Sequence, residues 1–366
     1  MRFLMLNWRD PETPTAGGAE RVSLAYLSAL VQRGHEVCWF ANYFPGAERQ
    51  KQIAGIHLYR GGGRGTSILA AWRWYRKQQG FDLVIDQHHG IPWFAPWWCR
   101  THCVACVHEV LGPIWDSFFP WPINAVGRWQ EQWTHWLYRN VPFWVGSQST
   151  RNALGARGVR NVTLISYGIQ PISLPALEEK PLQPPLRLIV VSRFSPNKRI
   201  DHAVRLLRLL TDRAIEAQLT IVGHGLVEPN LRRLVRDLGL QTRVDFPGLL
   251  PEPEKNRRLE QSHFLVHTSV REGWGLNVIE ANALGTPAVV YPVAGLVDST
   301  FHEETGWVVP TETPEALADC LAAVLKDAGR YQEIRSKAWA RAQTYHWDRV
   351  LPRACAWLEA QARGAG

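Results

Sequence analysis

Short hydrophobic runs alternate along the chain with longer segments in which hydrophobic residues recur every three or four positions. The short runs are typical of buried strands, and the longer segments are typical of helices that cover them. In the first half, strands are predicted at Phe3–Leu6, Glu36–Ala41, Leu83–Ile85, Cys103–Val107 and Val141–Gly146. Helices are predicted at Ala19–Arg33 and Thr66–Gln79. This order indicates repeated strand–helix units.

The second half repeats this rhythm. Strands are predicted at Leu186–Val191, Gln218–Val222, Val244–Phe246, Phe264–Val266 and Ala288–Tyr291. Helices are predicted at Asp201–Leu210, Val227–Leu238, Asn277–Leu284, Thr313–Lys326, Arg330–Thr344 and Arg349–Ala362. Strands that alternate with helices form parallel sheets covered on both faces. The ligands of such sheets bind beyond the carboxyl ends of the strands.

A proline-rich segment separates the two halves. Gln170–Pro185 contains five prolines and two glutamates, which is typical of a linker. A chain of 366 residues is too long for one ordinary core, so two domains are expected. We predict an N-terminal domain at residues 1–165, a C-terminal domain at 166–345, and a final helix at 346–366 that packs back on the N-terminal domain.

Positive charge and tryptophan are concentrated in the first half. The net charge is +8, and residues 1–165 carry 17 Lys and Arg against 10 Asp and Glu. The same residues hold 13 of the 18 tryptophans. Tryptophan favours the lipid headgroup region and basic side chains are drawn to anionic lipid, so an anionic membrane surface is one candidate partner. The alternative is a basic surface that serves solubility, with tryptophan filling the core.

Other bulk features narrow the protein class. No hydrophobic run reaches the ~18 residues of a membrane-spanning helix, and the N-terminus does not resemble a signal peptide. Six cysteines in 366 residues indicate a reducing compartment and not a disulfide framework. We therefore expect a cytoplasmic protein, either free or peripheral on the inner face of the plasma membrane.

The segment Thr268–Pro287 carries the most informative motif. Glu272 precedes Gly273-Trp274-Gly275-Leu276, and Glu280 stands eight positions after Glu272. Glycines let backbone N–H groups approach an anion at a helix N-terminus, where the helix dipole adds attraction. Glu272 is placed to accept hydrogen bonds from sugar hydroxyls, and Glu280 from a ribose. The alternative is a strand–turn–helix whose acidic residues only stabilise the helix.

This segment resembles the E-x7-E region of retaining family 4 glycosyltransferases, which belong to the glycosyl transferases group 1. The resemblance rests on the two glutamates, the two glycines, and the turn with Gly285 and Pro287. Further segments agree: Ser192–Arg199 resembles the family's G-R-x-x-x-x-K-G stretch, Gly17–Glu20 its Gly-Gly loop, and Val107–Glu109 its His-Asp/Glu stretch. The resemblance covers nearly the whole chain. It implies two Rossmann-like, doubly wound parallel-sheet domains that face each other across a cleft (GT-B).

The resemblance implies roles for the charged residues and for one histidine. Arg193 and Lys198 would neutralise the donor diphosphate, which suits the planar fork of Arg and the point charge of Lys. The alternative is a pair of ordinary surface cations. Glu272 would hold the transferred sugar and Glu280 the ribose. His108 would orient the donor sugar and is not assigned as a general base.

The resemblance also implies roles for the glycine loops and for the two domains. Gly17 and Gly18 would approach the donor phosphate and the acceptor. Gly273, Trp274, Gly275 and Leu276 would line the donor site. The N-terminal domain would be the acceptor side, and the C-terminal domain the nucleotide-sugar donor side.

The sequence departs from the family pattern at two loops. Ser192 stands where the family usually has Gly, and Arg199 follows Lys198 where Gly is common. Gly223-His224-Gly225 stands where Gly-Asp/Glu-Gly is more usual, and no role is assigned to His224. These departures put the geometry of the loops in question. They do not affect the expected function, because the charges of Arg193 and Lys198 are kept.

No metal or cofactor is expected. The chain has no Asp-x-Asp motif, so fixed positive charge is expected to replace a metal ion at the diphosphate. Cys99, Cys103 and Cys106 have a spacing seen in iron–sulfur proteins. The last two lie in a predicted strand that points them to opposite faces, which favours buried free thiols.

An aromatic-rich region at Ile91–Leu137 leaves three interpretations open. Trp129, Trp133 and Trp136 share one face of a predicted helix. The aromatic side chains could enter a membrane interface, stack on a glycan acceptor, or pack the N-terminal domain.

These observations together predict a metal-independent retaining hexosyltransferase. It would move a sugar from a nucleotide-diphosphate sugar, UDP- or GDP-linked, to a hydroxyl of a glycan or lipid-linked acceptor in polysaccharide or glycolipid synthesis. No nucleic-acid partner is expected. The alternatives are a nucleotide-sugar epimerase with the same architecture, and a non-catalytic protein that binds a sugar nucleotide or a membrane lipid.

Overall fold

The computed structural model describes residues 1–63, 65–170, 174 and 176–364. The chain forms two compact units, each with its own sheet. Unit 1 comprises Met1–Gly112, Ala125–Gly168 and Trp347–Gly366, and unit 2 comprises Pro113–Asn124 and Ile169–His346. Positions 171–173 and 175 of the predicted linker lie outside the described residues. Its described positions form no helix or strand.

Unit 1 contains an eight-stranded sheet with the order β3-β4-β2-β1-β5-β6-β7-β8. All neighbouring strands are parallel except β3 and β4, which form an antiparallel hairpin. The strands are β1 (Arg2–Leu6), β2 (Glu36–Ala41), β3 (Gln50–Ile53), β4 (Ile56–Arg60), β5 (Leu83–His88), β6 (His102–Val107), β7 (Phe143–Val145) and β8 (Val162–Leu164). The central strands are buried on both faces, as continuous hydrophobic runs predict for a parallel sheet.

Five helices and one 3-10 turn belong wholly or mainly to unit 1. They are α1 (Gly18–Gln32), α2 (Ser67–Tyr75), the turn η1 (Ala95–Trp97), α4 (Ile123–Leu137), α5 (Gln148–Gly155) and α13 (Trp347–Ala362). Helix α13 packs against α1 and against β5 and β6. Glu359 of α13 accepts two hydrogen bonds from Arg33 at 2.6 and 2.9 Å and lies 2.9 Å from Nε2 of His35. The last helix is therefore an integral layer of unit 1.

Unit 2 contains a six-stranded sheet with the order β11-β10-β9-β12-β13-β14, and its neighbouring strands are all parallel. The strands are β9 (Leu186–Val191), β10 (Ala217–Val222), β11 (Val244–Gly248), β12 (Phe264–His267), β13 (Ala288–Val290) and β14 (Gly306–Val308). The order reverses next to β9, since β10 lies on one side of it and β12 on the other. Ligands of open α/β sheets bind at such a switch point.

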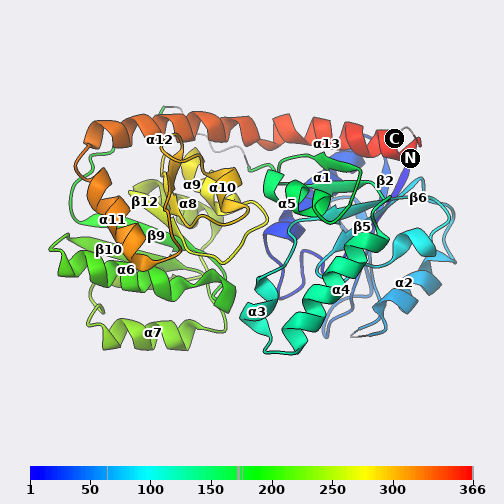
Figure 1. Ribbon diagram of the computed structural model, residues 1–366. Coiled ribbons are helices and arrows are strands. Elements are labelled where there is room, and N and C mark those ends of the chain that lie inside the picture. Colours follow the sequence, from blue (N-terminus) through cyan, green and yellow to red (C-terminus); the bar gives the residue numbers. More distant parts are fainter. Residues whose placement is uncertain (64, 171–173, 175, 365–366) are drawn as a thin grey trace. The chain divides into compact units, whose positions relative to one another are not determined.

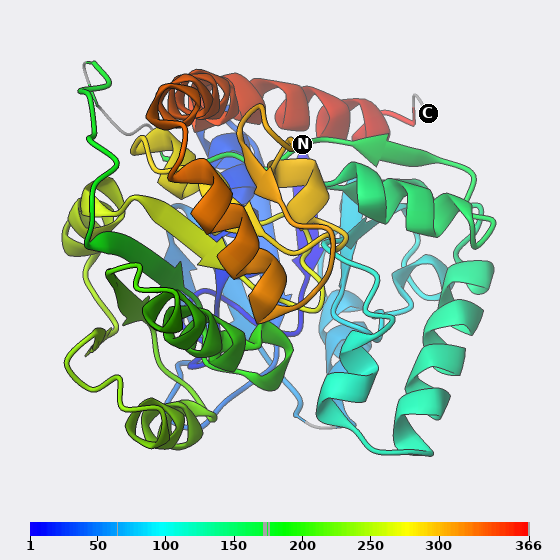
Figure 2. The same cartoon turned by 60° about the vertical axis from the view of Figure 1, so that its left-hand side comes forward.

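The longer helices of unit 2 carry buried hydrophobic residues. The helices and 3-10 turns of this unit are α3 (Ile114–Phe118), η2 (Pro196–Lys198), α6 (Ile200–Asp212), α7 (Glu228–Asp237), α8 (Glu252–Gln261), α9 (Leu276–Ala283), α10 (Leu296–Ser299), α11 (Pro314–Val324), α12 (Ala328–Ala342) and η3 (Gln343–Tyr345). In α6, Ala203, Val204, Leu207 and Leu210 are fully buried at helical spacing. Helices α6 and α11 contact each other and lie side by side in Figures 1 and 2.

The predicted fold class of two parallel α/β sheets is confirmed. Strands β2 and β9 have the predicted bounds, and most other elements differ from prediction by one to three residues. Helix α2 ends at Tyr75, four residues before the predicted end at Gln79. The β3–β4 hairpin was not predicted, because Gln50, Lys51 and Gln52 are exposed and give no hydrophobic run.

Candidate functional site

Four loops of unit 2 meet at the carboxyl edge of its sheet. They follow β9, β10, β12 and β13, which are neighbours in the sheet. Because parallel strands all end at the same edge, the loop after β9 with Arg193 and Lys198 lies beside the loop after β12 with Glu272. Sequence segments more than 70 residues apart are thereby brought together. This edge of unit 2 is the candidate site.

Lys198 and Glu272 form an ion pair at the centre of this edge. The Glu272 carboxylate also accepts a hydrogen bond of 2.6 Å from Ser269 Oγ, and Nε2 of His267 lies 3.6 Å from it. Burial raises the pKa of Glu272, but Lys198, His267 and the hydrogen bond from Ser269 together outweigh burial and leave the pKa lowered to about 2. Burial lowers the pKa of His267 to about 4. Glu272 is therefore a carboxylate that can accept hydrogen bonds at neutral pH.

The glycines of Gly223-His224-Gly225 let the loop after β10 approach the loop that carries Arg193. A Cβ atom at Gly223 would clash with the carbonyl oxygen of Ser192, and one at Gly225 with that of Phe194. The N–H of Phe194 donates to the carbonyl of His224 at 2.8 Å. The exposed Arg193 side chain is therefore displayed on a backbone fixed on both sides.

Arg199 occupies the position where a glycine was expected and adopts the conformation that glycine favours. Its φ is +46°, in the left-handed region. Its guanidinium donates to the carbonyl oxygens of Thr268 and Ser269, both at 2.8 Å, and pairs with Glu312 at 2.7 Å. These bonds connect the Lys198 loop to the Glu272 loop and offset the backbone strain.

Glu280 points to a partner that the sequence did not reveal. The ammonium of Lys255, on α8, donates to Glu280 Oε2 at 3.0 Å and pairs with Glu252 at 2.7 Å. The Glu280 side chain is 12% exposed and that of Lys255 9% exposed. Nothing in the sequence around Lys255 distinguishes it from the other charged residues of α8. Glu280 is therefore held by a cation from a neighbouring helix.

The loop Glu272–Leu276 depends on two glycines with positive φ. Gly275 has a φ of +93° and precedes Leu276, which begins α9. Gly295, after β13, has a φ of +84°, and a Cβ there would clash with the carbonyl oxygen of Glu272. Gly273 lies between Glu272 and Trp274, whose indole is 3% exposed. The ring centroid of Trp274 lies 4.8 Å from that of Tyr345, so this side chain packs behind the loop.

A similar set of polar residues lies at the carboxyl edge of unit 1. Gly17 caps α1, which begins at Gly18, and its N–H donates to Glu20 Oε2 at 2.7 Å. The other Glu20 oxygen lies 3.0 Å from Nε of Arg9 and 3.4 Å from Nε2 of His89. Burial raises the pKa of Glu20, but His89, Arg9 and the N–H of Gly17 together outweigh burial and leave the pKa lowered to about 2.

His108 has both ring nitrogens engaged within unit 1. Gln87 Nε2 lies 3.0 Å from Nε2 of His108, and the Tyr167 hydroxyl lies 2.6 Å from Nδ1. Ser23 Oγ donates to Gln87 Oε1 at 2.7 Å, which leaves the amide nitrogen of Gln87 as the donor to His108. Nε2 of His108 then accepts, and Nδ1 carries the proton toward Tyr167. Burial lowers the pKa of His108 to about 3, so the ring is neutral at physiological pH.

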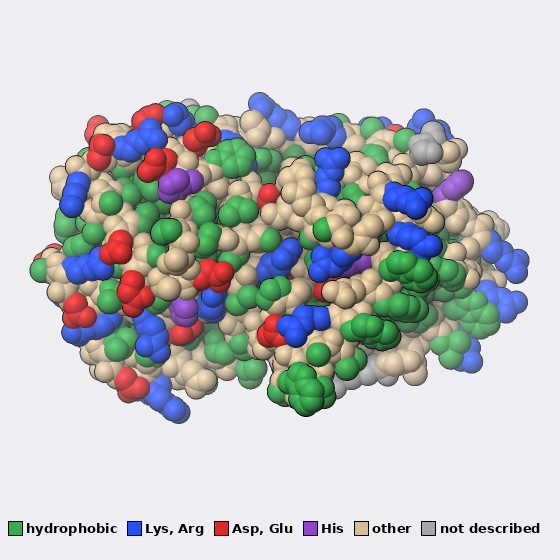
Figure 3. Space-filling view, viewed as in Figure 1, with side chains coloured by type: hydrophobic (Ala, Val, Ile, Leu, Met, Phe, Trp, Pro, Cys, Tyr) green, Lys and Arg blue, Asp and Glu red, His purple; other side chains and the backbone are tan. Residues whose placement is uncertain are grey.

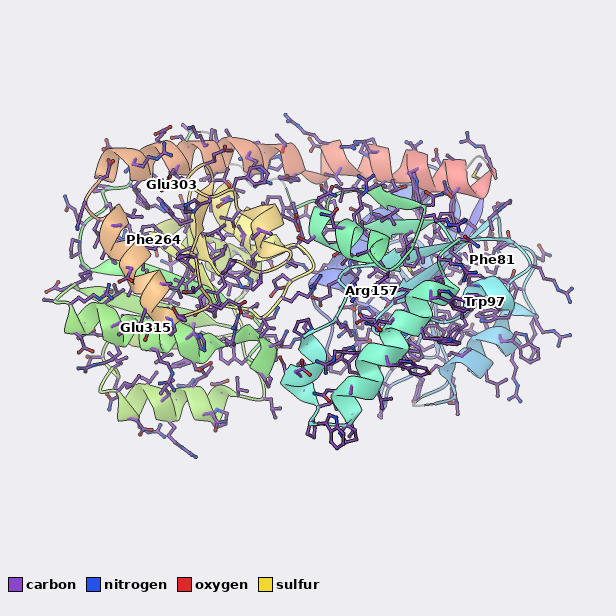
Figure 4. The ribbon with its side chains drawn as sticks, in the orientation of Figure 1. Phe81, Trp97, Arg157, Phe264, Glu303 and Glu315 are labelled. Carbon is purple, nitrogen blue, oxygen red and sulfur yellow. The ribbon has the colours of Figure 1, made fainter. Side chains whose placement is uncertain are left out.

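The predicted residues therefore form two groups. Unit 2 brings together Arg193, Lys198, Glu272–Leu276 and Glu280, and unit 1 contains Gly17, Gly18 and His108. A pocket of about 560 Å³ in unit 2, between β14 and α11, contains none of them. Glu303 and Glu315, labelled in Figure 4, lie on its border. Sequence reasoning missed Lys255, Arg199 as a connecting residue, Gly295, and Gln87 with Tyr167.

Family models match both halves of the chain. Residues 178–341 match the model described as glycosyl transferases group 1, and residues 16–171 match glycosyltransferase family 4. An uncharacterized glycosyltransferase of Methanocaldococcus jannaschii is 31% identical over 165 residues, which is 44% of this chain and 42% of the relative. The amylovoran biosynthesis glycosyltransferase AmsK of Erwinia amylovora is 27% identical over 189 residues, 50% of this chain and 46% of the relative. The chain thus spans less than half the length of these curated relatives.

Solved structures share the fold over the whole chain. Sucrose-phosphate synthase from Thermosynechococcus elongatus superposes with a TM-score of 0.81 at 20% identity and covers all of both chains. HepE of Anabaena in complex with UDP and glucose gives a TM-score of 0.73 at 17% identity, covering 98% of this chain and 100% of HepE. These similarities establish the fold. Among the helices that the structure describes, none is both long enough and hydrophobic enough to span a bilayer.

Proposed function

Taking the chain as a member of the GT-B glycosyltransferases, as its two family matches and its fold indicate, we propose that it transfers a sugar from a nucleotide-diphosphate sugar to an acceptor hydroxyl. The donor is UDP- or GDP-linked, and the anomeric configuration is retained. The acceptor is a glycan or a lipid-linked sugar in polysaccharide or glycolipid synthesis. A lipid-linked acceptor would bring the protein to the cytoplasmic face of a membrane.

One observation carries this proposal, the pairing of Lys198 with Glu272 at the carboxyl edge of unit 2. A cation and an ionised carboxylate side by side suit a ligand in which a diphosphate is joined directly to a sugar. The exposed Arg193 adds a second cation on the same loop. Glu280, which lies on α9 after the same loop, would accept hydrogen bonds from ribose hydroxyls while it is held by Lys255.

The proposed mechanism uses fixed charge to stabilise the leaving group. Arg193 and Lys198 neutralise the departing nucleoside diphosphate, and the backbone N–H groups at the start of α9 add donors. Glu272 accepts hydrogen bonds from the sugar hydroxyls and orients the ring. The acceptor hydroxyl forms a bond to the anomeric carbon as the bond to the phosphate oxygen breaks, and its proton passes to that oxygen. No metal ion is required, since the side chains supply the positive charge.

We assign unit 1 to the acceptor and to positioning of the sugar. A Cβ on Gly17 would meet only Glu20 Oε2, at an ordinary 3.9 Å. The fold of unit 1 therefore does not require a glycine there, whereas a closely approaching phosphate or acceptor would. His108, whose nitrogens are both engaged by neighbours, acts in this proposal as a neutral surface that orients the donor and not as a base.

The test combines donor binding with product analysis. Purified protein is screened by thermal shift against UDP, GDP, ADP, dTDP and their sugar conjugates, because a ligand at about 100 times its Kd stabilises the fold by about 2.7 kcal/mol. Glu272→Ala and Arg193→Ala should each abolish transfer to the acceptor found while the fold is kept. Arg205→Ala, which removes an exposed arginine of α6, is the matched control and should retain transfer. Near-normal turnover by a folded Glu272→Ala variant would refute the proposal.

The same assay separates the two alternatives. An epimerase would convert the donor without any acceptor, and a binding protein would show saturable binding without nucleotide release. The matches to two glycosyltransferase family models favour transfer over simple binding.

A further inference from the structure

Helix α4 has hydrophobic side chains on its outer face and polar side chains on its inner face. The outer stripe has exposed fractions of 61, 65, 44 and 54% at Val126, Trp129, Trp133 and Trp136. The buried face consists of Gly127, Glu131, Thr134 and His135. A surface helix of a water-soluble domain shows the opposite arrangement. The tryptophan stripe is therefore not spent on the core of unit 1.

Hydrogen bonds fix α4 in this orientation. Glu131, 4% exposed, accepts from the N–H groups of Leu111 and Gly112 at 2.6 and 3.0 Å. Turning the helix to bury its tryptophans would remove the carboxylate from both donors. The hydrogen bonds of Glu131 thus determine that the tryptophan stripe faces outward.

The hydrophobic surface continues beyond the helix. Trp97 of η1 is 51% exposed, and its ring centroid lies 4.8 Å from that of Tyr138, the residue that follows α4. Figure 4 labels Trp97 beside the helix, and Figure 3 shows the hydrophobic side chains gathered over α4. We call Trp97, Val126, Trp129, Trp133 and Trp136 the aromatic surface.

Positive charge accompanies this surface. The guanidinium of Arg139 lies 4.4 Å from the ring centre of Trp136. In α4, all of whose residues are described, the only acidic residue is the buried Glu131. Lys and Arg side chains border the hydrophobic area in Figure 3. The aromatic surface therefore suits a partner that is hydrophobic at depth and negative at its boundary.

We propose that the aromatic surface binds the headgroup region of an anionic lipid bilayer, with α4 lying in the plane of the membrane. Tryptophan rings prefer that depth, and Arg139 would meet lipid phosphates. The stripe extends for about 15 Å along the helix, which fits an interfacial helix and not a spanning one. This surface is separate from the residues assigned to sugar transfer, so it can be tested without any donor.

Charge argues against the two other occupants. Two copies of this surface placed face to face would bring the two Arg139 guanidiniums into one contact, and none of the five residues of the aromatic surface is acidic. A neutral glycan carries no negative charge for Arg139 to pair with. An anionic bilayer provides a headgroup region for the tryptophan rings and negative charge for Arg139.

The test is cosedimentation of the full chain with vesicles of phosphatidylcholine, with and without about one third phosphatidylglycerol. We expect binding to the anionic vesicles and much weaker binding to the neutral ones. Trp129→Ser/Trp133→Ser/Trp136→Ser should lower the partition coefficient at least ~10-fold. Arg139→Gln should weaken binding to the anionic vesicles by about fivefold and leave binding to the neutral ones unchanged.

The control is Leu226→Ser/Leu249→Ser, which removes two exposed leucines of unit 2 and should leave vesicle binding unchanged. Unchanged melting temperature and nucleotide thermal shift in every variant show that the fold and the donor site are intact. Equal vesicle binding by the wild type and the triple tryptophan variant would overturn the proposal. The proposal would also be overturned if neither the wild type nor the triple variant bound vesicles, and the wild type formed a dimer or bound a glycan in a way that the triple variant does not.

Discussion

The guanidinium of Arg199 donates a hydrogen bond of 2.8 Å to the carbonyl oxygen of Thr268, and the backbone of Arg199 itself is left-handed, with φ +46°. A residue that strains its backbone at the boundary of a site is held there by what its side chain contacts. In this protein the contact joins the Lys198 loop to the Glu272 loop, and this relationship can be separated into two measurable parts.

Substitution of Arg199 should distinguish backbone strain from side-chain bonding. Arg199→Ala loses the bonds to Thr268 and Ser269 and keeps the left-handed strain, whereas Arg199→Gly loses the bonds and relieves the strain. Both should be less stable than the wild type. Arg199→Gly should be the more stable of the two by about 1 kcal/mol. Urea unfolding gives both values, and an alanine variant as stable as the glycine variant would contradict this account.

Gly295→Ala should disturb the Glu272 loop more than its own backbone explains. The new Cβ would clash with the carbonyl oxygen of Glu272. Gly239→Ala is the matched control, since Gly239 also has a positive φ, +68°, but has open space around it. The control should cost about 1–2 kcal/mol of stability, and Gly295→Ala should cost more and weaken nucleotide binding. Equal losses of stability with equal nucleotide binding would show that the clash is relieved.

The hydrogen bonds of His108 predict its tautomer. Gln87 donates to Nε2, so nitrogen NMR should find the proton on Nδ1, with the signal assigned by its loss in His108→Asn. In Gln87→Glu a carboxylate faces the same nitrogen and should move the proton to Nε2. It should also raise the pKa of His108 above its lowered value of about 3. A proton on Nε2 in the wild type would refute the assigned network.

Buried histidines should make the protein sensitive to mild acid. Burial lowers the pKa of His88, His108 and His135 to about 3, whereas an unfolded histidine titrates near 6.5. Between those values the unfolded chain binds more protons, so stability is full above about pH 6.5 and falls as the pH drops toward 3. Each histidine contributes a slope of about 1.4 kcal/mol per pH unit. Urea unfolding from pH 7 to pH 4 measures the slope, and His108→Asn should reduce it by about one proton. An unchanged slope in this variant would show that His108 does not contribute to the pH dependence of stability.

The sequence predicted the elements whose physics is local. The short run Leu186–Val191, hydrophobic except for Arg187, favours a buried strand, and its bounds were correct. The motif with Glu272 and Glu280 also marked the correct strand–loop–helix. These predictions succeeded because hydrophobic period and glycine spacing are properties of short segments.

The residues that were missed depend on contacts between distant segments. Lys255 gains its meaning only when α8 packs near α9 and its ammonium meets Glu280. Gly295 is required by the carbonyl of Glu272, which lies more than twenty residues away in sequence. The outward face of α4 was visible as a helical stripe of tryptophans. Its direction was not, since Glu131 and its two backbone donors decide it.

Unit 1 is not complete until helix α13, the last helix of the chain, has been translated. The buried residues of this helix, Ala354, Cys355 and Leu358, pack in unit 1, and Glu359 holds Arg33 of α1, yet α13 is translated after all of unit 2. Residues 1–168 therefore emerge from the ribosome while the face of α1 that packs on α13 is uncovered and Arg33 lacks its partner Glu359. Unit 2 ends at His346, so its sequence is complete before α13 is translated and it can fold first, although its sheet is encoded second. The order of folding is thus expected to run against the order of translation.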